Sequence, residues 1–335
     1  MRIATNKFSF LKILVYSSIL FLLISGCASN QSEVKGINFN DKFNTSKKWI
    51  GLDHDQLVDE IYSAGFNAVR IPIKVSDKIN NEDEKIKFFS SLEDFSNKLM
   101  AKNLLVVIDL HDNFYSNPSV ESDWSDLLLA WSEIIKVFKK YDEKLVYEIL
   151  NEPHGVNIEK NWIDMQESVI KKIRKEDGNK KRKIIVTPHG WSDISSYKNF
   201  KKINQENIFY TFHYYEPFLF THQGAYWTKN HYPVGAVWRG KISELKIVRD
   251  FLLMSVISPS GNIVLGEFGV INLAKDDVSK REWINVVKRE AKKNGYWSFY
   301  WSMNGDFGIY DEKNNCWNKS ALLELTGGGY AKLCD

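Results

Sequence analysis

The 335-residue sequence lacks the features that would divide it into several domains or give it one predominant sign of charge. It contains no linker rich in proline, glycine or serine and no short repeat, so we expect a single domain. Three of its 45 basic residues and none of its 42 acidic residues precede Cys27, so the two signs balance in the rest of the chain. A balanced charge gives no indication of a nucleic-acid partner.

The chain has little that could span a membrane. An apolar stretch from Ile13 to Ile24 follows the basic residues Arg2, Lys7 and Lys12, but it is short for crossing a bilayer. A basic start followed by a short apolar run is typical of an export signal that is later removed.

The end of this stretch, Leu23-Ile24-Ser25-Gly26-Cys27, resembles the lipoprotein box of bacteria, although Ile24 stands where leucine is more usual. The resemblance implies that residues 1–26 are a signal peptide and that Cys27 carries lipid. We then expect residues 27–35 to be a short tether, and the protein to be an exported bacterial lipoprotein. A lipid anchor alone would hold it at a cell membrane, such as the outer membrane, facing the periplasm or the surface. An ordinary signal peptide that happens to carry a cysteine is the alternative.

Only three cysteines are present, so with Cys27 acylated at most one disulfide can form, between Cys316 and Cys334. An oxidising compartment would allow that pair to form and to tie down the C-terminal tail. Two unpaired thiols are the alternative.

Eight short apolar runs recur along the chain, mostly separated by stretches with apolar residues at helical spacing. Runs of this length between turn residues are typical of buried parallel strands. Eight alternating strand and helix units predict an α/β fold, a single (β/α)8 TIM barrel over residues 36–335. The predicted strands are 36–39, 68–73, 104–110, 145–150, 183–188, 208–212, 262–265 and 296–301. Two long connections, 112–123 and 214–239, are expected to wall a cleft.

Two glutamates follow predicted strands, Glu152 after the fourth and Glu267 after the seventh. Barrel enzymes carry their reactive groups at this C-terminal end of the strands. Two carboxylates on opposite walls of a cleft are what glycoside hydrolysis requires, one to protonate the leaving oxygen and one to attack the sugar or activate water. For either glutamate taken alone, capping of a following helix is the alternative.

Other polar and aromatic side chains are predicted at the same end of the barrel. Strands two, three, four, six and eight carry them at or after their C-terminal ends, and they are Arg70, His111, Asn151, His213, Tyr215 and Trp301. Each has an ordinary structural explanation by itself, but their coincidence at one face predicts a single site. Aromatic residues make up 14 % of the chain, and stacking faces for sugar rings are one use for them.

The chain resembles glycoside hydrolase family 5, the former cellulase family A, over essentially all of the sequence after the signal. The segments that carry the resemblance are Val69-Arg70-Ile71-Pro72, Asp109-Leu110-His111, Asn151-Glu152-Pro153, His213-Tyr214-Tyr215, Gly266-Glu267-Phe268-Gly269 and Trp301. It implies a retaining hydrolase with Glu152 as acid/base and Glu267 as nucleophile, and without a metal or organic cofactor. We expect a monomer that acts on a β-linked polysaccharide or oligosaccharide.

Two segments depart from the usual pattern of the family. After strand one the family usually has Asn-Leu-Gly-Asn, whereas Asn38-Phe39-Asn40-Asp41 stands here. Asp112 follows His111 where some relatives have a second histidine. These departures concern the rim of the site and the glycone subsites.

The chemistry assigns an expected role to each residue. Glu267 has to stay ionised, and Arg70 and Tyr215 are placed to stabilise its charge. Glu152 has to start protonated, so burial and the nearby anion should raise its pKa. Asn151 is expected to donate to the sugar 2-hydroxyl.

The remaining side chains are expected to bind and orient the substrate. His111 and His213 would orient hydroxyls and neighbouring side chains. Trp301 would form the floor beneath the distorted sugar, and Trp191 a platform on the leaving-group side. The segment 214–227 resembles the strand-six loop of endoglucanases in the family, and its Trp227 can offer a ring face to further sugars.

Internal cleavage of a β-1,4-linked glucan is therefore the expected activity, with β-mannanase, xyloglucanase and mixed-linkage glucanase as alternatives. A metal-dependent barrel hydrolase would use His111, Asp112, His213 and the two glutamates as ligands, but the His-x-His of such barrels is absent. A lipoprotein that only binds glycans would require one of the two carboxylates to be missing.

Overall fold

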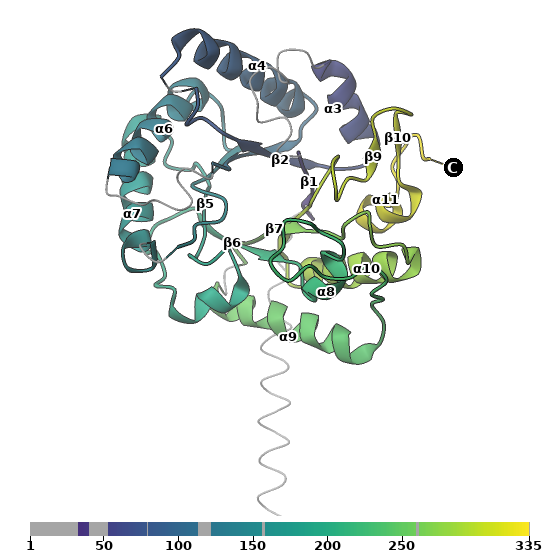
Figure 1. Ribbon diagram of the computed structural model, residues 1–335. Coiled ribbons are helices and arrows are strands. Elements are labelled where there is room, and N and C mark those ends of the chain that lie inside the picture. The colour runs from purple at the N-terminus through teal and green to yellow at the C-terminus, as the bar shows by residue number, and fades with distance from the viewer. Residues whose placement is uncertain are drawn as a thin grey trace, which may run out of the picture. The chain divides into compact units, whose positions relative to one another are not determined.

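Figure 1 shows the computed structural model, which describes residues 33–39, 53–78, 80–112, 122–155, 158–258 and 261–334. Eight parallel strands form a closed barrel in which each strand pairs with its neighbours in sequence and β8 pairs with β1. The strands are β1 (Lys35–Asn38), β2 (Ala68–Ile73), β3 (Leu105–Leu110), β4 (Leu145–Glu148), β5 (Ile184–Val186), β6 (Ile208–Tyr214), β7 (Ile263–Phe268) and β8 (Trp297–Tyr300). The predicted (β/α)8 barrel is confirmed. Cys27 and the predicted signal lie outside the described residues.

Helices cover the outside of the barrel (Figure 1). They are α3 (His54–Ser63), α4 (Glu82–Ala101), α6 (Ser122–Phe138), α7 (Ile158–Asp177), α9 (Lys241–Ile257), α10 (Asp277–Lys293) and α11 (Lys319–Thr326), with the short helices α8 (Phe218–Thr221) and η2 (Ile194–Asn199). Short polar side chains begin several of them, because their oxygens accept backbone N–H groups of the first turn. Asp53, Asn81, Asp276 and Asn318 do so for α3, α4, α10 and α11.

Side chains inside the barrel form layers, because residues two apart in a strand share a face. Towards the N-terminal ends of the strands, the layer is an apolar cluster formed by Ala68, Val107, Val146, Ile185, Phe209, Val264, Trp297 and Phe299. Two positions further along β2, β3 and β4 stand Arg70, Asp109 and Glu148, all fully buried. The site described below rests on this charged layer.

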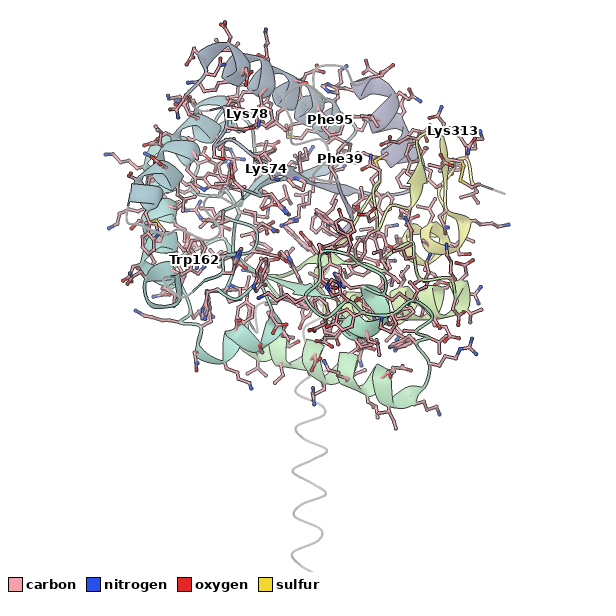
Figure 2. All side chains as sticks on the ribbon, in the orientation of Figure 1. Phe39, Lys74, Lys78, Phe95, Trp162 and Lys313 are labelled. Atoms are coloured by element: carbon pink, nitrogen blue, oxygen red, sulfur yellow. A yellow bond between two sulfur atoms is a disulfide. The ribbon has the colours of Figure 1, made fainter. Side chains whose placement is uncertain are left out.

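A second core lies between the barrel and its helices. Phe39, directly after β1, packs edge-on against Phe95 of α4 with ring centroids 5.0 Å apart (Figure 2). Trp131 of α6 packs in the same way against Tyr147 of β4, at 5.4 Å. Contacts of this kind fix the helices on the strands, so the strand ends that carry the site are held rigidly.

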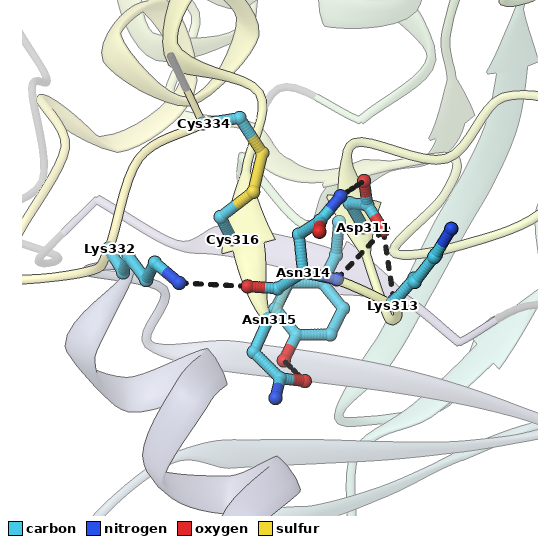
Figure 3. The surroundings of a disulfide bond; sticks show 8 residues. Asp311, Lys313, Asn314, Asn315, Cys316, Lys332 and Cys334 are labelled. Atoms are coloured by element: carbon cyan, nitrogen blue, oxygen red, sulfur yellow. Dashed lines mark hydrogen bonds between the residues drawn. A yellow bond between two sulfur atoms is a disulfide. The ribbon is translucent and has the colours of Figure 1, made fainter.

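The C-terminal segment forms a small hairpin of β9 (Tyr310–Asp311) and β10 (Cys316–Trp317). Cys316 and Cys334 are joined in a disulfide, as Figure 3 shows, so the alternative of two unpaired thiols is not what the structure shows. Two backbone hydrogen bonds of Trp317 accompany it, one to the Lys332 carbonyl and one from the Cys334 N–H. The tail is thereby tied to the hairpin.

The long connection after β6 contains α8 and leads to α9, a helix that the sequence analysis did not predict. Most of the other long connection, 112–123, lies outside the described residues. Within the described ranges, no helix combines the length and the apolar character needed to cross a bilayer.

Candidate active site

The base of the site is Arg70, a fully buried arginine that contacts three carboxylates. Its Nε and one terminal nitrogen donate to both oxygens of Glu148, at 2.7 and 2.8 Å. It also lies 3.0 Å from Asp109 and 2.9 Å from Glu267. Burial acts to lower the pKa of Arg70, but the three carboxylates outweigh it and hold that pKa above its ordinary value. Arg70 is therefore a fixed cation below the mouth of the barrel.

Two asparagines complete the hydrogen bonding of Arg70. Asn38 accepts from it at 3.0 Å, and the Asn38 amide donates to the Gly266 carbonyl at 2.9 Å. Asn151 accepts from it at 2.8 Å. Strands β1, β2 and β7 and the end of β4 are thus joined through a single guanidinium group.

Glu267 lies within β7 rather than after it, because β7 continues to pair with β6 beyond the predicted end at residue 265. Arg70 donates to its Oε1 at 2.9 Å, and the Tyr215 hydroxyl donates to its Oε2 at 2.9 Å. Burial, together with the charges of Glu267 and Glu152, raises the pKa of Tyr215 well above its usual range, so this hydroxyl keeps its proton. Both oxygens of Glu267 therefore have donors that favour a carboxylate.

Glu152 lies four residues beyond the end of β4, and its side chain is 24 % exposed. Its Oε1 is 2.7 Å from Nδ1 of His213. Burial raises the pKa of Glu152 to about 7, and the charge of Glu148 adds to the rise, whereas His111, Arg70 and His154 oppose it. An oxygen of Glu152, an oxygen of Glu267 and a ring nitrogen of His213 all lie within 4.8 Å of one another.

His213 is held as a neutral ring between the two glutamates. Burial lowers its pKa to about 4, although the charge of Glu267 opposes this. A neutral imidazole carries one N–H, and the 2.7 Å contact with the carboxylate oxygen of Glu152 assigns that hydrogen to Nδ1. The other nitrogen, Nε2, is buried and has no hydrogen-bond partner among the residues that the structure describes.

His111 links the charged layer to the rim of the site. Its Nδ1 lies 2.9 Å from Asp109, and its Nε2 lies 3.1 Å from the Asn151 amide. Because Asp109 can only accept when ionised and the amide nitrogen only donates, Nδ1 carries the proton. The His111 ring stacks against Trp301 with centroids 5.6 Å apart.

The aromatic residues expected to bind sugars lie at different distances from this group. Trp191 is 56 % exposed, and its ring stacks on His154 with centroids 3.6 Å apart. Its backbone N–H donates to the Pro153 carbonyl, which places it beside Glu152. Trp227 is 46 % exposed and lies further out, 6.5 Å from Phe307, which in turn packs 5.9 Å from Tyr215.

Three residues that bind Arg70, namely Asn38, Asp109 and Glu148, were given no role in the site by sequence reasoning. A signal for two of them was present, because Asp109 and Glu148 are charged residues inside otherwise apolar strand runs and have to be paired there. Burial raises the pKa of Asp109 to about 7 against the effect of Arg70, and it also raises the pKa of Glu148. His222, whose ring packs 4.9 Å from Tyr215, was missed as well.

The geometry does not suit a metal ion at the two glutamates. Both oxygens of Glu267 already accept hydrogens, one of them from the fixed cation Arg70, which would repel a metal. Asp112, a ligand in the metal-dependent alternative, instead accepts from the backbone N–H groups of Val75 and Ser76. The donor set is therefore that of a proton-transfer site.

Comparisons with known proteins identify the family of the chain. A family model described as "Cellulase (glycosyl hydrolase family 5)" matches residues 27–306. Endoglucanase H of Acetivibrio thermocellus is 26 % identical over 280 residues, which cover 81 % of this chain and 29 % of that protein. The chain spans less than two thirds of the length of the first curated relatives it matches, at 29 %, 65 % and 57 %.

Solved structures give the same result. The cellulose synthase subunit Z of Clostridioides difficile is 30 % identical with a TM-score of 0.79, and 88 % of this chain and 99 % of that chain are covered. Cel5A of Thermotoga maritima, in a structure with mannotriose, is 31 % identical with a TM-score of 0.78, and coverage is 87 % and 96 %. Since the family model covers well over half of the sequence, this chain belongs to glycosyl hydrolase family 5.

Proposed function

We propose that the protein is a retaining, endo-acting glycoside hydrolase that cleaves internal β-1,4 linkages of a glucan, with Glu152 as acid/base and Glu267 as nucleophile. The observation that carries the proposal is a pair of carboxyl groups that differ in their surroundings, with an oxygen of one lying within 4.8 Å of an oxygen of the other. Retaining hydrolases place their carboxyl groups about 5–5.5 Å apart, whereas inverting ones leave about 6.5–9.5 Å for a water molecule. The short separation supports retention.

The different surroundings support the division of roles. Glu267 accepts hydrogen bonds from Arg70 and Tyr215, so its carboxyl group is aimed by two fixed donors. Glu152 has a pKa of about 7, so at mildly acidic pH it holds a proton that it can donate. Because His213 donates its N–H to Oε1 of Glu152, the transferable proton is carried on Oε2.

The proposed reaction has two displacements. In the first, Glu267 forms a bond to the anomeric carbon while the glycosidic C–O bond breaks and the leaving oxygen takes the proton of Glu152. In the second, Glu152, now a carboxylate, removes a proton from water, and the water oxygen displaces Glu267 from the same carbon. The sugar retains its configuration, and both carboxyl groups return to their starting state.

Azide distinguishes the two roles. With an aryl β-glucoside oligomer whose leaving phenol needs no protonation, Glu267→Ala should form an α-glycosyl azide, because azide occupies the space of the missing carboxylate and attacks once. Glu152→Ala should form a β-glycosyl azide, because azide replaces water in the second displacement. The opposite assignment of the two products would exchange the roles, and proton NMR of an inverted first product from the wild type would exclude retention.

The substrate preference is supported by the exposed aromatic side chains along the rim and by the similar proteins. Trp191, Tyr226 and Trp227 are all about half exposed or more, as rings that stack on several sugars would be. Thermotoga maritima Cel5A has been solved with cellobiose and with mannotriose, so β-mannan is the second candidate substrate. Viscosity and reducing ends should be measured together on carboxymethyl cellulose, mixed-linkage β-glucan and glucomannan. A fast viscosity loss on the glucans is expected, and activity confined to unsubstituted mannan would overturn the glucan preference.

We also propose that lipid on Cys27 anchors the protein at a membrane, on the basis of the sequence before β1. Two acyl groups hold a protein firmly where one is marginal, and an acylated cysteine of this kind carries at least two. Cys27→Ser should move the enzyme to the soluble fraction with unchanged specific activity on a soluble glucan. A wild-type chain that is wholly soluble with an unmodified N-terminus would refute the anchor.

A further inference from the structure

Helix α9 has an outward face that the barrel does not use. The helix packs inward through buried residues such as Ile247, Phe251 and Met254. Phe251 packs edge-on against Phe212 and Tyr214 of β6, at 5.4 and 5.3 Å. The apolar residues on the other side of the helix therefore need a different explanation.

The exposed residues of α9, named here the α9 face, are five apolar and three basic side chains. They are Lys241, Ile242, Leu245, Lys246, Arg249, Leu252, Leu253 and Val256. Ile242 is 86 % and Val256 77 % exposed. No acidic side chain of the helix is exposed, since Asp250 is buried and Glu244 is only partly exposed and bound to Arg289.

These residues form one continuous surface along the outer side of the barrel, where Figure 1 shows α9. At 100° per residue the eight positions fall within an arc of about 140°. The apolar residues and Arg249 occupy the middle, and Lys241 and Lys246 lie at the two edges. Lys246 and Arg249 share the buried Asp250, so the surface keeps an excess of positive charge.

An apolar surface with basic edges matches the interface of an anionic membrane. Such helices lie in the plane of the bilayer with the apolar side chains between lipid headgroups and the basic groups beside phosphates. Each uncompensated cation near an anionic surface adds to the binding, so the net positive charge that remains after Asp250 is paired favours this partner. A soluble protein partner would not by itself explain the absence of exposed acidic residues.

The short segment between the proposed anchor at Cys27 and β1 is consistent with the same partner. If Cys27 is anchored in lipid, the eight residues from there to Lys35 of β1 reach at most about 28 Å. Parallel strands all begin at one end of the barrel, and α9 leads into the start of β7, so its Val256 end lies at the same end of the barrel as β1. The anchor would keep this end near the bilayer and would raise the local concentration of the α9 face there.

We propose that the α9 face docks onto an anionic lipid surface and lays the barrel on its side against the membrane. This inference rests on the proposed anchor and is independent of the hydrolase chemistry. The contact is weak without the anchor, and the anchor alone leaves the orientation of the barrel free. Together they fix which side of the enzyme faces the lipid.

A fluorescent probe on the α9 face tests the proposal. The full-length chain carrying Leu253→Cys is recovered from membranes, labelled with an environment-sensitive thiol dye and reconstituted into phosphatidylglycerol or phosphatidylcholine vesicles. The matched control carries Leu323→Cys on α11, because Leu323 is 45 % and Leu253 52 % exposed. The unsubstituted chain measures the background labelling. In phosphatidylglycerol vesicles the probe at 253 should emit further to the blue and be quenched less by acrylamide than the probe at 323.

A second variant identifies the surface responsible. Leu245→Glu with Val256→Glu places two anions on the α9 face, and it should abolish the shielding of the probe at 253 while leaving hydrolysis of a soluble glucan unchanged. Equal quenching at 253 and 323 in phosphatidylglycerol vesicles would refute the docking. Shielding that increases with protein density and does not depend on lipid charge would indicate that a second copy of the chain covers the α9 face. That result would also refute docking onto lipid. A chain that does not stay with vesicles at all refutes both anchor and docking, while its activity on soluble glucan reports separately on the proposed function.

Discussion

The Glu152 carboxyl should set the alkaline limit of activity and should also limit the stability of the protein. In the proposed mechanism only its protonated form can act in the first displacement. With a pKa of about 7, about nine tenths of the enzyme is protonated at pH 6 and about one tenth at pH 8. The ratio kcat/KM should therefore fall about tenfold for each pH unit above 7. Glu152→Gln should lose this alkaline fall, together with about 10²- to 10⁴-fold of the rate on unactivated glucan.

The same pKa has a cost in stability. The folded protein binds the Glu152 proton more tightly than the unfolded chain, whose ordinary value is 4.5, so stability declines as pH rises from about 4.5 to about 7. At about 1.4 kcal/mol for each pH unit, the full loss above pH 7 is about 3 kcal/mol. Glutamine has no charge to bury and can still accept the His213 hydrogen bond. Glu152→Gln should thus be more stable than the wild type by about 3 kcal/mol at pH 8, a rise in Tm of about 5 °C, and equally stable below pH 4.5.

Urea denaturation at pH 4.5, 6 and 8, with kcat/KM on a soluble unactivated glucan over the same range, measures both effects. A variant whose stability advantage does not grow with pH would contradict the buried-carboxylate explanation. If kcat/KM of Glu152→Gln still falls at alkaline pH, the titration of another group causes the fall. Asp109 is the first candidate, because burial raises its pKa to about 7 as well. Asp109→Asn would then shift the pH at which kcat/KM falls.

Three further outcomes follow from the structure. Arg70→Met leaves buried carboxylates without their cation and should destabilise the protein by about 3–5 kcal/mol at pH 8. The loss should be smaller at pH 5, because protonation removes the charge of the carboxylates. Urea titrations at both pH values measure the difference. Cys334→Ser removes the disulfide that closes a loop with a sequence separation of 18, and it should lower the free energy of unfolding by about 3 kcal/mol with kcat unchanged. A calorimetric Tm equal to that of the wild type would contradict this prediction. Trp191→Ala should weaken binding of longer oligosaccharides about 2- to 10-fold with little change in Tm. An equal loss of binding with short aryl glycosides would show that the ring acts at the reaction centre instead.

The barrel and the residues at the strand ends were predictable because their signals are local. A buried parallel strand is a short apolar run, and its C-terminal end is known once the run ends. Arg70, Asn151, His213, Tyr215 and Glu267 were therefore placed together without knowledge of the packing. The ends of the strands were predicted less accurately. Strand β7 continues through Glu267 to Phe268, because its pairing with β6 extends it beyond the apolar run.

Two features were hidden from the sequence for different physical reasons. Helix α9 is apolar on its buried and its exposed sides, so it has no stripe at helical spacing and periodicity could not reveal it. The charged layer of Asp109 and Glu148 depends on which face of each strand points inward and on an arginine in another strand. Such pairing is a property of the closed barrel, and a single strand does not carry it.

The arginine at the base of the site also has a consequence for how the enzyme folds. Arg70 bonds to Glu148 at a sequence separation of 78 and to Glu267 at a separation of 197. A partly folded chain with strands β2 to β4 in place can pair Arg70 with Asp109 and Glu148, but Glu267, the proposed nucleophile, arrives only when β7 docks. Contacts between such distant residues form late because closing long loops has to precede them. During refolding, catalytic activity should therefore return with the last step of barrel closure, after most helical signal has already recovered.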